Sequence, residues 1–242
     1  MRRADPLNSM FRGHKVGGAW RLYLNDARND LWIRECVFPG LRDGYFVEAG
    51  AGDGFRDSSC FVLERELGWR GLCVEPNDSL FVELTQRRPG SIHENVCLTG
   101  TSRAVCYLAA ELGGLHPYLS GIRENLLTFK QGGGQIVTKG REISKTGTPL
   151  ADLLRKHDAP SLIDYAALDL EGSELEVLSS FPFGEYHFRA LSMECDGSMW
   201  RSMTEILEPA GYREVSNPFN LDCPWERYWL HASTQAPPRT DL

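Results

Sequence analysis

A short apolar run leads directly into three glycines at alternate positions, in the segment FVEAGAGDG over residues 46–54. Glycine permits positive φ, and because it has no Cβ it lets a ligand approach the backbone. A helix that begins just after such a turn points its free N–H groups, with their partial positive charge, at the bound ligand. A tight structural turn could carry the same letters. The pattern indicates a cradle for a nucleotide-type cofactor, built from Gly50, Ala51, Gly52, Asp53 and Gly54.

An acidic residue after the next apolar run strengthens this interpretation. Glu75 follows Leu72-Cys73-Val74 and lies 21 residues beyond Gly54 (75 − 54 = 21). In a βαβ unit, an acid at this distance accepts hydrogen bonds from both ribose hydroxyls. The two features together predict a cofactor that contains a ribose.

Two carboxylates at the glycine turn bear on which cofactor this is. Glu48 lies two residues before Gly50, and Asp53 lies within the turn. Both would repel the anionic pyrophosphate of a dinucleotide, whereas they would attract an ammonium or a sulfonium group. S-adenosylmethionine carries both cations and a ribose. The turn therefore favours S-adenosylmethionine, with a nicotinamide-dependent oxidoreductase as the alternative.

A second set of carboxylates follows two later apolar runs, with Asp169 after residues 163–168 and Glu194 and Asp196 after residues 190–193. Ligands of open α/β sheets bind at the carboxyl ends of strands, and neighbouring ends lie ~5 Å apart. Such oxygen ligands suit Mg²⁺ or a similar cation, which would lower the pKa of an acceptor hydroxyl. Alternatively, Asp169 orients the methionine ammonium while Glu171 and Glu194 make cap or backbone hydrogen bonds.

An enzyme without a metal would need a general base whose pKa is near neutrality, and histidine is the usual choice. His116 lies in a segment of irregular composition and is the histidine that we expect to face an acceptor. We therefore take Asp169, Glu194 and His116 as the candidate catalytic residues.

Short apolar runs alternate with amphipathic stretches, a pattern that predicts a parallel sheet with helices on its faces. The predicted strands are residues 45–49, 71–74, 92–98, 104–109, 162–168, 187–194, 212–215 and 227–232, the last two pairing as an antiparallel hairpin. The predicted helices are residues 20–36, 58–67, 79–88, 150–156, 173–180 and 198–208. Residues 1–18 are expected to form a flexible arm. Residues 19–242 are expected to form a single domain with an irregular, substrate-side insertion at about 113–149.

Composition limits the partners. The 242 residues are 42% hydrophobic and 24% charged, which is ordinary for a globular protein. The formal net charge of −7 argues against nucleic acid as a partner. No apolar run approaches the ~18 to 20 residues that cross a bilayer, and the first twenty residues lack the apolar stretch of a secretory signal. The seven cysteines contain no CxxC pair, so we expect buried, reduced thiols in a cytoplasmic protein without a membrane partner.

Three stretches in this order, FVEAGAGDG followed by Ser58, then LERELGWRGLCVEPN, then LDLEGSELEVL, carry a family resemblance. The sequence resembles the FkbM-type S-adenosylmethionine-dependent methyltransferases from about Ala27 to Trp229. The resemblance is weak in residues 113–149 and absent from the first twenty residues. Two departures are Asp78, where the family pattern has Pro, and Cys60, where it has Thr.

The resemblance implies a Rossmann-like class I methyltransferase fold, with a seven-stranded, mostly parallel sheet whose last strand is antiparallel and with helices on both faces. It also implies cofactor contacts, carried over by position, from Gly50, Gly52, Gly54, Glu75, Asn95 and Val96. We expect further cofactor contacts from Glu48, Ala51, Asp53, Ser58, Pro76, Asp169 and Glu171. We expect transfer of a methyl group to a hydroxyl of a sugar or secondary metabolite, with or without a divalent metal. A non-catalytic binding protein on the same fold is the remaining alternative.

Overall fold

The computed structural model describes residues 10–110, 119–126, 140–195, 197 and 199–234. Seven strands form the main sheet in the order β12-β13-β11-β10-β3-β4-β5. They are β3 (Tyr45–Ala49), β4 (Arg70–Val74), β5 (Ile92–Glu94), β10 (Leu162–Leu168), β11 (His187–Glu194), β12 (Tyr212–Val215) and β13 (Glu226–His231). All neighbours from β11 to β5 pair in parallel, and β13 runs antiparallel to both β11 and β12. This confirms the predicted sheet and its closing hairpin.

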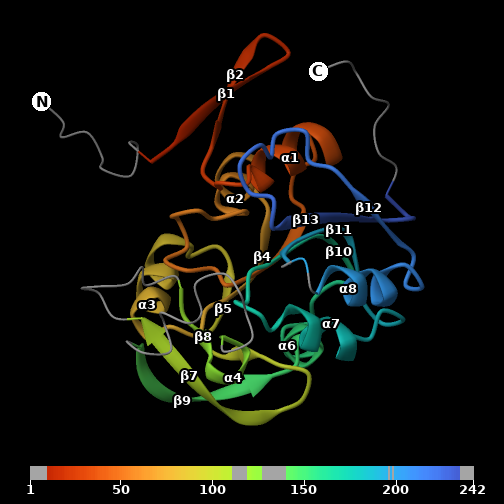
Figure 1. The fold of residues 1–242 in the computed structure, drawn as a ribbon. Helices are drawn as coiled ribbons and strands as arrows, with labels where there is room; N and C mark the ends of the chain where they lie inside the picture. The colour runs from red at the N-terminus through yellow and green to blue at the C-terminus, as the bar shows by residue number, and fades with distance from the viewer. Residues whose placement is uncertain (1–9, 111–118, 127–139, 196, 198, 235–242) are drawn as a thin grey trace, which may run out of the picture.

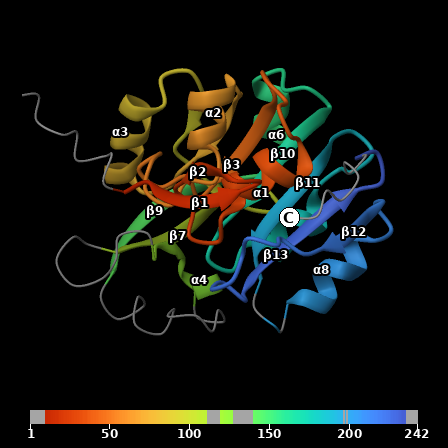
Figure 2. The same cartoon turned by 90° about the horizontal axis from the view of Figure 1, so that it is seen from above.

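Helices cover both faces of the main sheet (Figures 1 and 2). They are α1 (Asn29–Trp32), which continues as the π-helix η2 (Ile33–Val37), α2 (Phe61–Leu67), α3 (Asp78–Arg87), α6 (Leu150–Lys156), α7 (Glu174–Ser180) and α8 (Trp200–Leu207). Val47 belongs to a buried cluster with side chains of α6, α7 and α8, whereas Phe46 belongs to one with α1, α2 and α3. Successive side chains of a strand point to opposite faces, so both faces of β3 are buried. None of the described helices is long and apolar enough to cross a membrane.

A second sheet lies beside the carboxyl ends of the main strands, and its order is β6-β9-β7-β8. Its strands are β6 (Cys97–Leu98), β7 (Arg103–Ala110), β8 (Gly121–Ile122) and β9 (Gly140–Thr148), with the short helix α4 (Arg123–Leu126) after β8. Figure 1 shows β7 and β9 as a curved pair at the bottom of the molecule. The single strand predicted at 92–98 is therefore divided between two sheets.

The second sheet corrects the expectation of an irregular insertion at 113–149. Nine residues of that range form β9, and the first eight of them pair antiparallel with β7. Sequence patterning gave no signal because most side chains of β9 are partly or fully exposed, and Ile143 is its one apolar contribution to the small cluster around Tyr107. Residues 113–118 and 127–139 lie outside the described residues.

The amino-terminal region also differs from expectation. Strands β1 (Arg12–Val16) and β2 (Ala19–Tyr23) form an antiparallel hairpin, so residues 12–16 are not a loose arm and residues 19–23 are not helical. Gly17 and Gly18 connect the strands with φ of 53° and 85°, the left-handed pair that a two-residue hairpin turn requires. Trp20 is 72% exposed, so its spacing from Tyr23 reflected no buried helical face. Residues 1–9 lie outside the described residues.

All seven cysteines are free thiols. Five of them are buried, but Cys36 is half-buried and Cys106 is exposed on β7. The expectation of buried thiols therefore fails at these two positions.

Candidate functional site

A cavity of about 350 Å³ opens at the carboxyl ends of β3, β4, β10 and β11. One part is lined by Gly50, Ala51, Gly52, Glu75, Pro76 and Val96, with Tyr107 and Ile122 of the second sheet. The other part is lined by Asn25, Asn29, Asp57, Trp225 and Glu226, and Asp169, Glu171 and Glu194 also contribute. The cavity therefore joins the two sets of residues that the sequence singled out.

The three glycines of the turn have φ of 82°, 55° and 77°, in the region that disfavours other residues. A Cβ on Gly50 would lie 2.0 Å from the carbonyl oxygen of Asp169, so glycine lets the β3 turn pack against the β10 turn. A Cβ on Gly54 would lie 2.7 Å from the side chain of Leu84. Gly50 and Gly52 line the cavity, whereas Gly54 packs against α3 and does not. This corrects the expectation of cofactor contact from Gly54.

Glu75 lies in the cavity wall, after the end of β4. Its carboxylate accepts hydrogen bonds from the backbone N–H of Gly52 at 2.8 Å and of Asn77 at 2.7 Å. Glu75 is only 5% exposed, and burial raises the pKa of its carboxyl to about 7, against the effect of the two N–H donors. Two backbone donors thus fix the carboxylate at the cavity wall.

Asn95 supports the Glu75 turn from behind. Its side-chain amide donates to the carbonyl oxygens of Glu75 at 2.9 Å and Pro76 at 3.3 Å. Asn95 does not line the cavity, whereas Pro76 and Val96 do. Adenine contact from Val96 stays a prediction, whereas Asn95 hydrogen-bonds the backbone of the loop and does not face the cavity.

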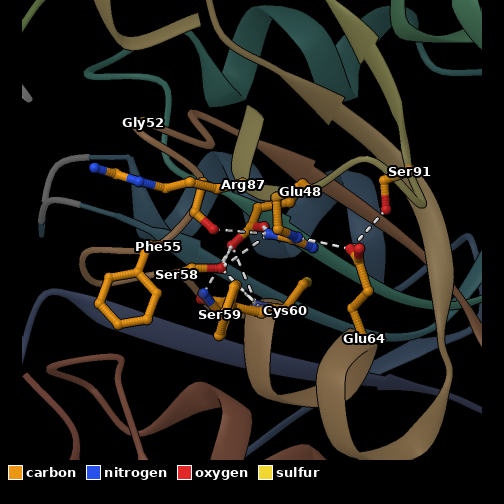
Figure 3. Close-up of polar contacts among 12 residues, drawn as sticks. Glu48, Gly52, Phe55, Ser58, Ser59, Cys60, Glu64, Arg87 and Ser91 are labelled. Carbon is orange, nitrogen blue, oxygen red and sulfur yellow. Dashed lines mark hydrogen bonds and ion pairs between the residues drawn. The ribbon is translucent and has the colours of Figure 1, made fainter. Parts of the chain in front are cut away.

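Glu48 has protein partners in place of the predicted cofactor cation. Its carboxylate accepts hydrogen bonds from the Ser58 hydroxyl at 2.8 Å and the Ser59 N–H at 2.7 Å (Figure 3). Its other oxygen accepts from Arg88 at 2.9 Å, and the side chain of Arg88 is fully buried. Because Arg88 neutralises Glu48, this carboxylate organises the start of α2. Glu48 and Ser58 both line the cavity, so cofactor contact from them stays a prediction, but Glu48 is paired with Arg88 and does not offer the unpaired negative charge that we expected.

Asp53 is neutralised in the same way. Its carboxylate accepts from the backbone N–H groups of Phe55 at 2.9 Å and Arg56 at 2.7 Å, and it forms an ion pair with Arg87. Asp53 does not line the cavity. Neither acid of the glycine turn therefore supplies the negative charge that we expected to select a cation.

The negative charge comes instead from the strand ends across the cavity. Asp169, Glu171 and Glu194 each place a carboxylate oxygen within 4.8 Å of the other two. Asp169 and Glu194 converge as their strand positions predicted, whereas Asp196 and His116 lie outside the described residues. The third carboxylate is Glu171, which the sequence had suggested as a cofactor contact or as a partner for cap or backbone hydrogen bonds, but not as a member of the cation site.

The three carboxyls hold protons unusually tightly. Burial, reinforced by the negative neighbours, raises the pKa of Glu194 to about 11 and of Glu171 to about 9. Asp169 is exposed to the cavity but enclosed by protein on its other sides, and burial also raises its pKa. Because Asp169 and Glu194 lie close together in the cavity, ionisation of one carboxyl disfavours ionisation of the other. A cation entering the cavity would displace these protons.

Glu171 stands out within this group. It adopts a φ of 53° and is only 8% exposed, and it lines the cavity. Within the part of the chain that the structure describes, its carboxylate has no hydrogen-bond or ion-pair partner. Glu174 fixes the backbone beside it by accepting from the N–H groups of Leu170 at 2.6 Å and Gly172 at 3.1 Å. The turn therefore holds a buried carboxylate toward the cavity without a protein partner.

Sequence reasoning missed the residues that close the cavity opposite the second sheet. The side-chain amide of Asn29 donates to Glu226 at 2.7 Å, which joins the amino-terminal segment to β13. Burial raises the pKa of Glu226 to about 8 and of Asp57 to about 7. No local signal could have found the pair, because Asn29 and Glu226 are 197 residues apart.

Comparisons with solved structures return methyltransferases among the similar folds. Fibrillarin from Methanococcus jannaschii is 13% identical over 95% of this chain and 85% of its own, with a TM-score of 0.44. Precorrin-6y C5,15-methyltransferase from Geobacter metallireducens is 11% identical over 83% and 82%, with a TM-score of 0.42. A TehB-like methyltransferase from Corynebacterium glutamicum is 9% identical over 84% of each chain, with a TM-score of 0.41. No curated protein matches the sequence.

The family comparison is decisive. Residues 48–214, more than half of the chain, match the family described as "Methyltransferase FkbM domain". The matched region contains the glycine turn, Glu75 and the carboxylates at the ends of β10 and β11, and the sheet order is that of the Rossmann-like class I methyltransferases. An oxidoreductase is therefore rejected. The chain belongs to the FkbM methyltransferase family, whose activity depends on S-adenosylmethionine.

Proposed function

We propose that the protein transfers the methyl group of S-adenosylmethionine to a hydroxyl oxygen of a small molecule, a sugar or another secondary metabolite. One observation carries the proposal. A single cavity has Glu75, the buried acid that would bind the ribose, on one wall and the carboxylates of Asp169 and Glu194 on another. A cofactor bound at Glu75 would therefore present its cationic centre to an acidic acceptor site.

The proposed cofactor position follows from charge and shape. The ribose hydroxyls would donate to Glu75, and the methionine part would run along Gly50 and Gly52, where glycine allows close approach. Glu48 and Asp53 are neutralised by Arg88 and Arg87, so the sulfonium and ammonium would be drawn toward Asp169 instead. The negative charge that would attract this cofactor therefore comes from Asp169 after β10 and not from the glycine turn.

Methyl transfer is a displacement at sulfur-bound carbon, and the protein mainly aligns and desolvates the two reactants. The carboxylates of Asp169 and Glu194 can accept a hydrogen bond from an acceptor hydroxyl and orient its oxygen. Because their pKa is raised, one of them can also take the proton that the hydroxyl releases. We place the acceptor between these residues and the wall formed by Asn29 and Glu226.

We further propose a divalent cation beside Asp169, Glu171 and Glu194. The donor set fits, since three carboxylates converge and that of Glu171 is buried without a partner among the described residues. When bound, the cation would lower the pKa of an acceptor hydroxyl. The chain's part is to hold the three oxygens in place, which Glu174 does by fixing the Leu170–Gly172 backbone.

Calorimetry on the purified chain tests the cofactor assignment. Titration with S-adenosylmethionine and with its demethylated product, S-adenosylhomocysteine, should each give saturable heat, whereas titration with NAD should give none. Methyl transfer is then measured as release of S-adenosylhomocysteine with monosaccharides and matched amino sugars as acceptors. Absence of heat from both adenosyl compounds, with folded protein, overturns the proposal. Turnover only with the amino group would overturn the choice of oxygen.

A further inference from the structure

Lys145 of the second sheet contacts the segments beside the Glu75 turn. Lys145 lies on β9, opposite Val105 of β7, and its side chain is only 9% exposed. Its ammonium donates to the side-chain oxygen of Asn95 at 2.7 Å and also pairs with Asp78 at the start of α3. One ammonium thus connects β9, the segment after β5 and the helix that follows the Glu75 turn.

Asn95 connects Lys145 to the backbone of the Glu75 turn. Its oxygen accepts from Lys145, and its amide donates to the backbone carbonyls of Glu75 and Pro76. The backbone N–H of Glu75 donates to the carbonyl of Glu94 at 3.0 Å. The backbone of the Glu75 turn therefore takes part in three hydrogen bonds, and the two from Asn95 are oriented by Lys145.

We propose that Lys145 is a positioning residue for the cofactor, which acts through Asn95 to hold Glu75 in the conformation that receives the ribose. This inference rests on the proposed function, since it concerns the same cofactor. Asp78, the second partner of Lys145, stands where the family pattern has Pro, which has no carboxylate. This ion pair therefore depends on a residue that the family pattern lacks. It connects the second sheet to the cavity wall that carries Glu75.

Electrostatics act in the same direction as geometry. Glu75 faces Lys145 from β9 and Asp169 from β10, and the uncharged Cys97 and Tyr107 lie on β6 and β7. Lys145 lowers the pKa of Glu75, whereas Asp169 raises it. Only ionised Glu75 accepts two hydroxyl hydrogen bonds, so removal of the ammonium should move cofactor binding to higher pH.

The experiment measures binding of S-adenosylhomocysteine to the full chain by calorimetry between pH 6 and 8.5. K145M should weaken binding about fivefold to tenfold at pH 7, roughly the effect of one lost hydrogen bond. Its half-maximal pH should lie above that of the wild type, and K145R should restore most of both. N95A should weaken binding similarly. At pH 8.5, where Glu75 is largely ionised and the direct charge effect of Lys145 is small, K145M/N95A should be no weaker than N95A alone, because both substitutions break one chain of contacts.

R155M is the matched control. Arg155 lies on α6, and it also forms ion pairs, with Asp152 and with Glu185. It should leave binding unchanged, and thermal melting checks that every variant is folded. Binding by K145M equal to that of the wild type overturns the inference alone. Weaker binding with an unmoved pH profile and additive effects of K145M and N95A also overturns it, because the role would then be merely structural. Absence of binding by the wild type overturns the proposed function, and this inference with it.

Discussion

Asp169 and Glu194 each place a carboxylate oxygen within 4.8 Å of the other, at the ends of the neighbouring strands β10 and β11. Two carboxylates this close in a cavity repel each other when both are ionised, so the pair favours a state in which one of them carries a proton. The proton is retained because burial raises the pKa of both groups. This pair sets the charge that a methyl donor or a cation meets in the cavity.

The pair makes stability depend on pH. The pKa of Glu194 rises from 4.5 to about 11 on folding, so the folded chain binds more protons between these values and becomes less stable as pH rises. E194Q removes this titration and should raise the melting temperature at pH 8 by about 2 to 4 °C, the effect of 1 kcal/mol in a chain of this size. Its advantage should shrink toward pH 5. A constant difference across scanning calorimetry from pH 5 to 9 would contradict the assignment.

Glu75 should control the affinity for the cofactor. E75A should weaken binding of S-adenosylmethionine by about 1 to 3 kcal/mol, the loss of a hydrogen bond to a charged group. Since burial raises the pKa of Glu75 to about 7, wild-type affinity should increase from pH 6 to 8 as the group ionises. E75Q should bind weakly with a flat pH profile in calorimetry. An E75A variant that binds like the wild type would falsify the ribose role.

The cation site should depend on Glu171. After exhaustive chelation, titration of the wild type with Mg²⁺ or Mn²⁺ should give saturable heat, and E171Q should bind at least about tenfold more weakly through the loss of one of three carboxylates. E176Q on α7 is the control, because Glu176 is tied to Arg103 at 3.0 Å. Equal heats from wild type and E171Q would reject Glu171 as a ligand. Full activity in chelator would reject the cation.

Arg88 should matter for stability more than any surface cation. R88M leaves Glu48 and Glu64 without their buried partner, and such a loss costs about 3 to 5 kcal/mol. Urea denaturation should show a lower midpoint for R88M, with partial recovery in E48Q/R88M. R155M removes only surface ion pairs and should leave the midpoint unchanged. An R88M midpoint equal to that of the wild type would show that the pair contributes nothing.

Gly50 should not tolerate a side chain. In G50A the new Cβ would lie 2.0 Å from the Asp169 carbonyl, and a φ of 82° alone strains alanine by about 1 to 3 kcal/mol. The variant should melt at lower temperature and lose S-adenosylhomocysteine binding. G184A, where a Cβ meets nothing within 4 Å, should behave like the wild type in both measurements. Normal binding by G50A would mean that the two turns do not pack as described.

The sequence alone was sufficient to predict features that depend on residues close together in the chain. Alternating apolar runs predicted the main sheet, because burial of both faces leaves a direct pattern along each strand, as at Phe46 and Val47. The glycine turn and Glu75 were predicted to lie together, and they do, because parallel neighbouring strands bring both to the same edge of the sheet; their binding of a cofactor stays a prediction. Asp169 and Glu194 were found because parallel strands end at the same edge of a sheet.

Charge partners and exposed strands were decided by the tertiary structure. Glu48 was misinterpreted because its neutralising partner, Arg88, is 40 residues away, and local sequence does not show which carboxylate a buried arginine meets. Strand β9 was missed because most of its side chains, on both faces, are partly or fully exposed, so no apolar alternation marks it. Glu171, which has no hydrogen-bond or ion-pair partner among the described residues, becomes buried only when the β10 turn packs against β3 and β8. Local periodicity fixes which elements form, whereas the packing of distant segments fixes the electrostatics of the site.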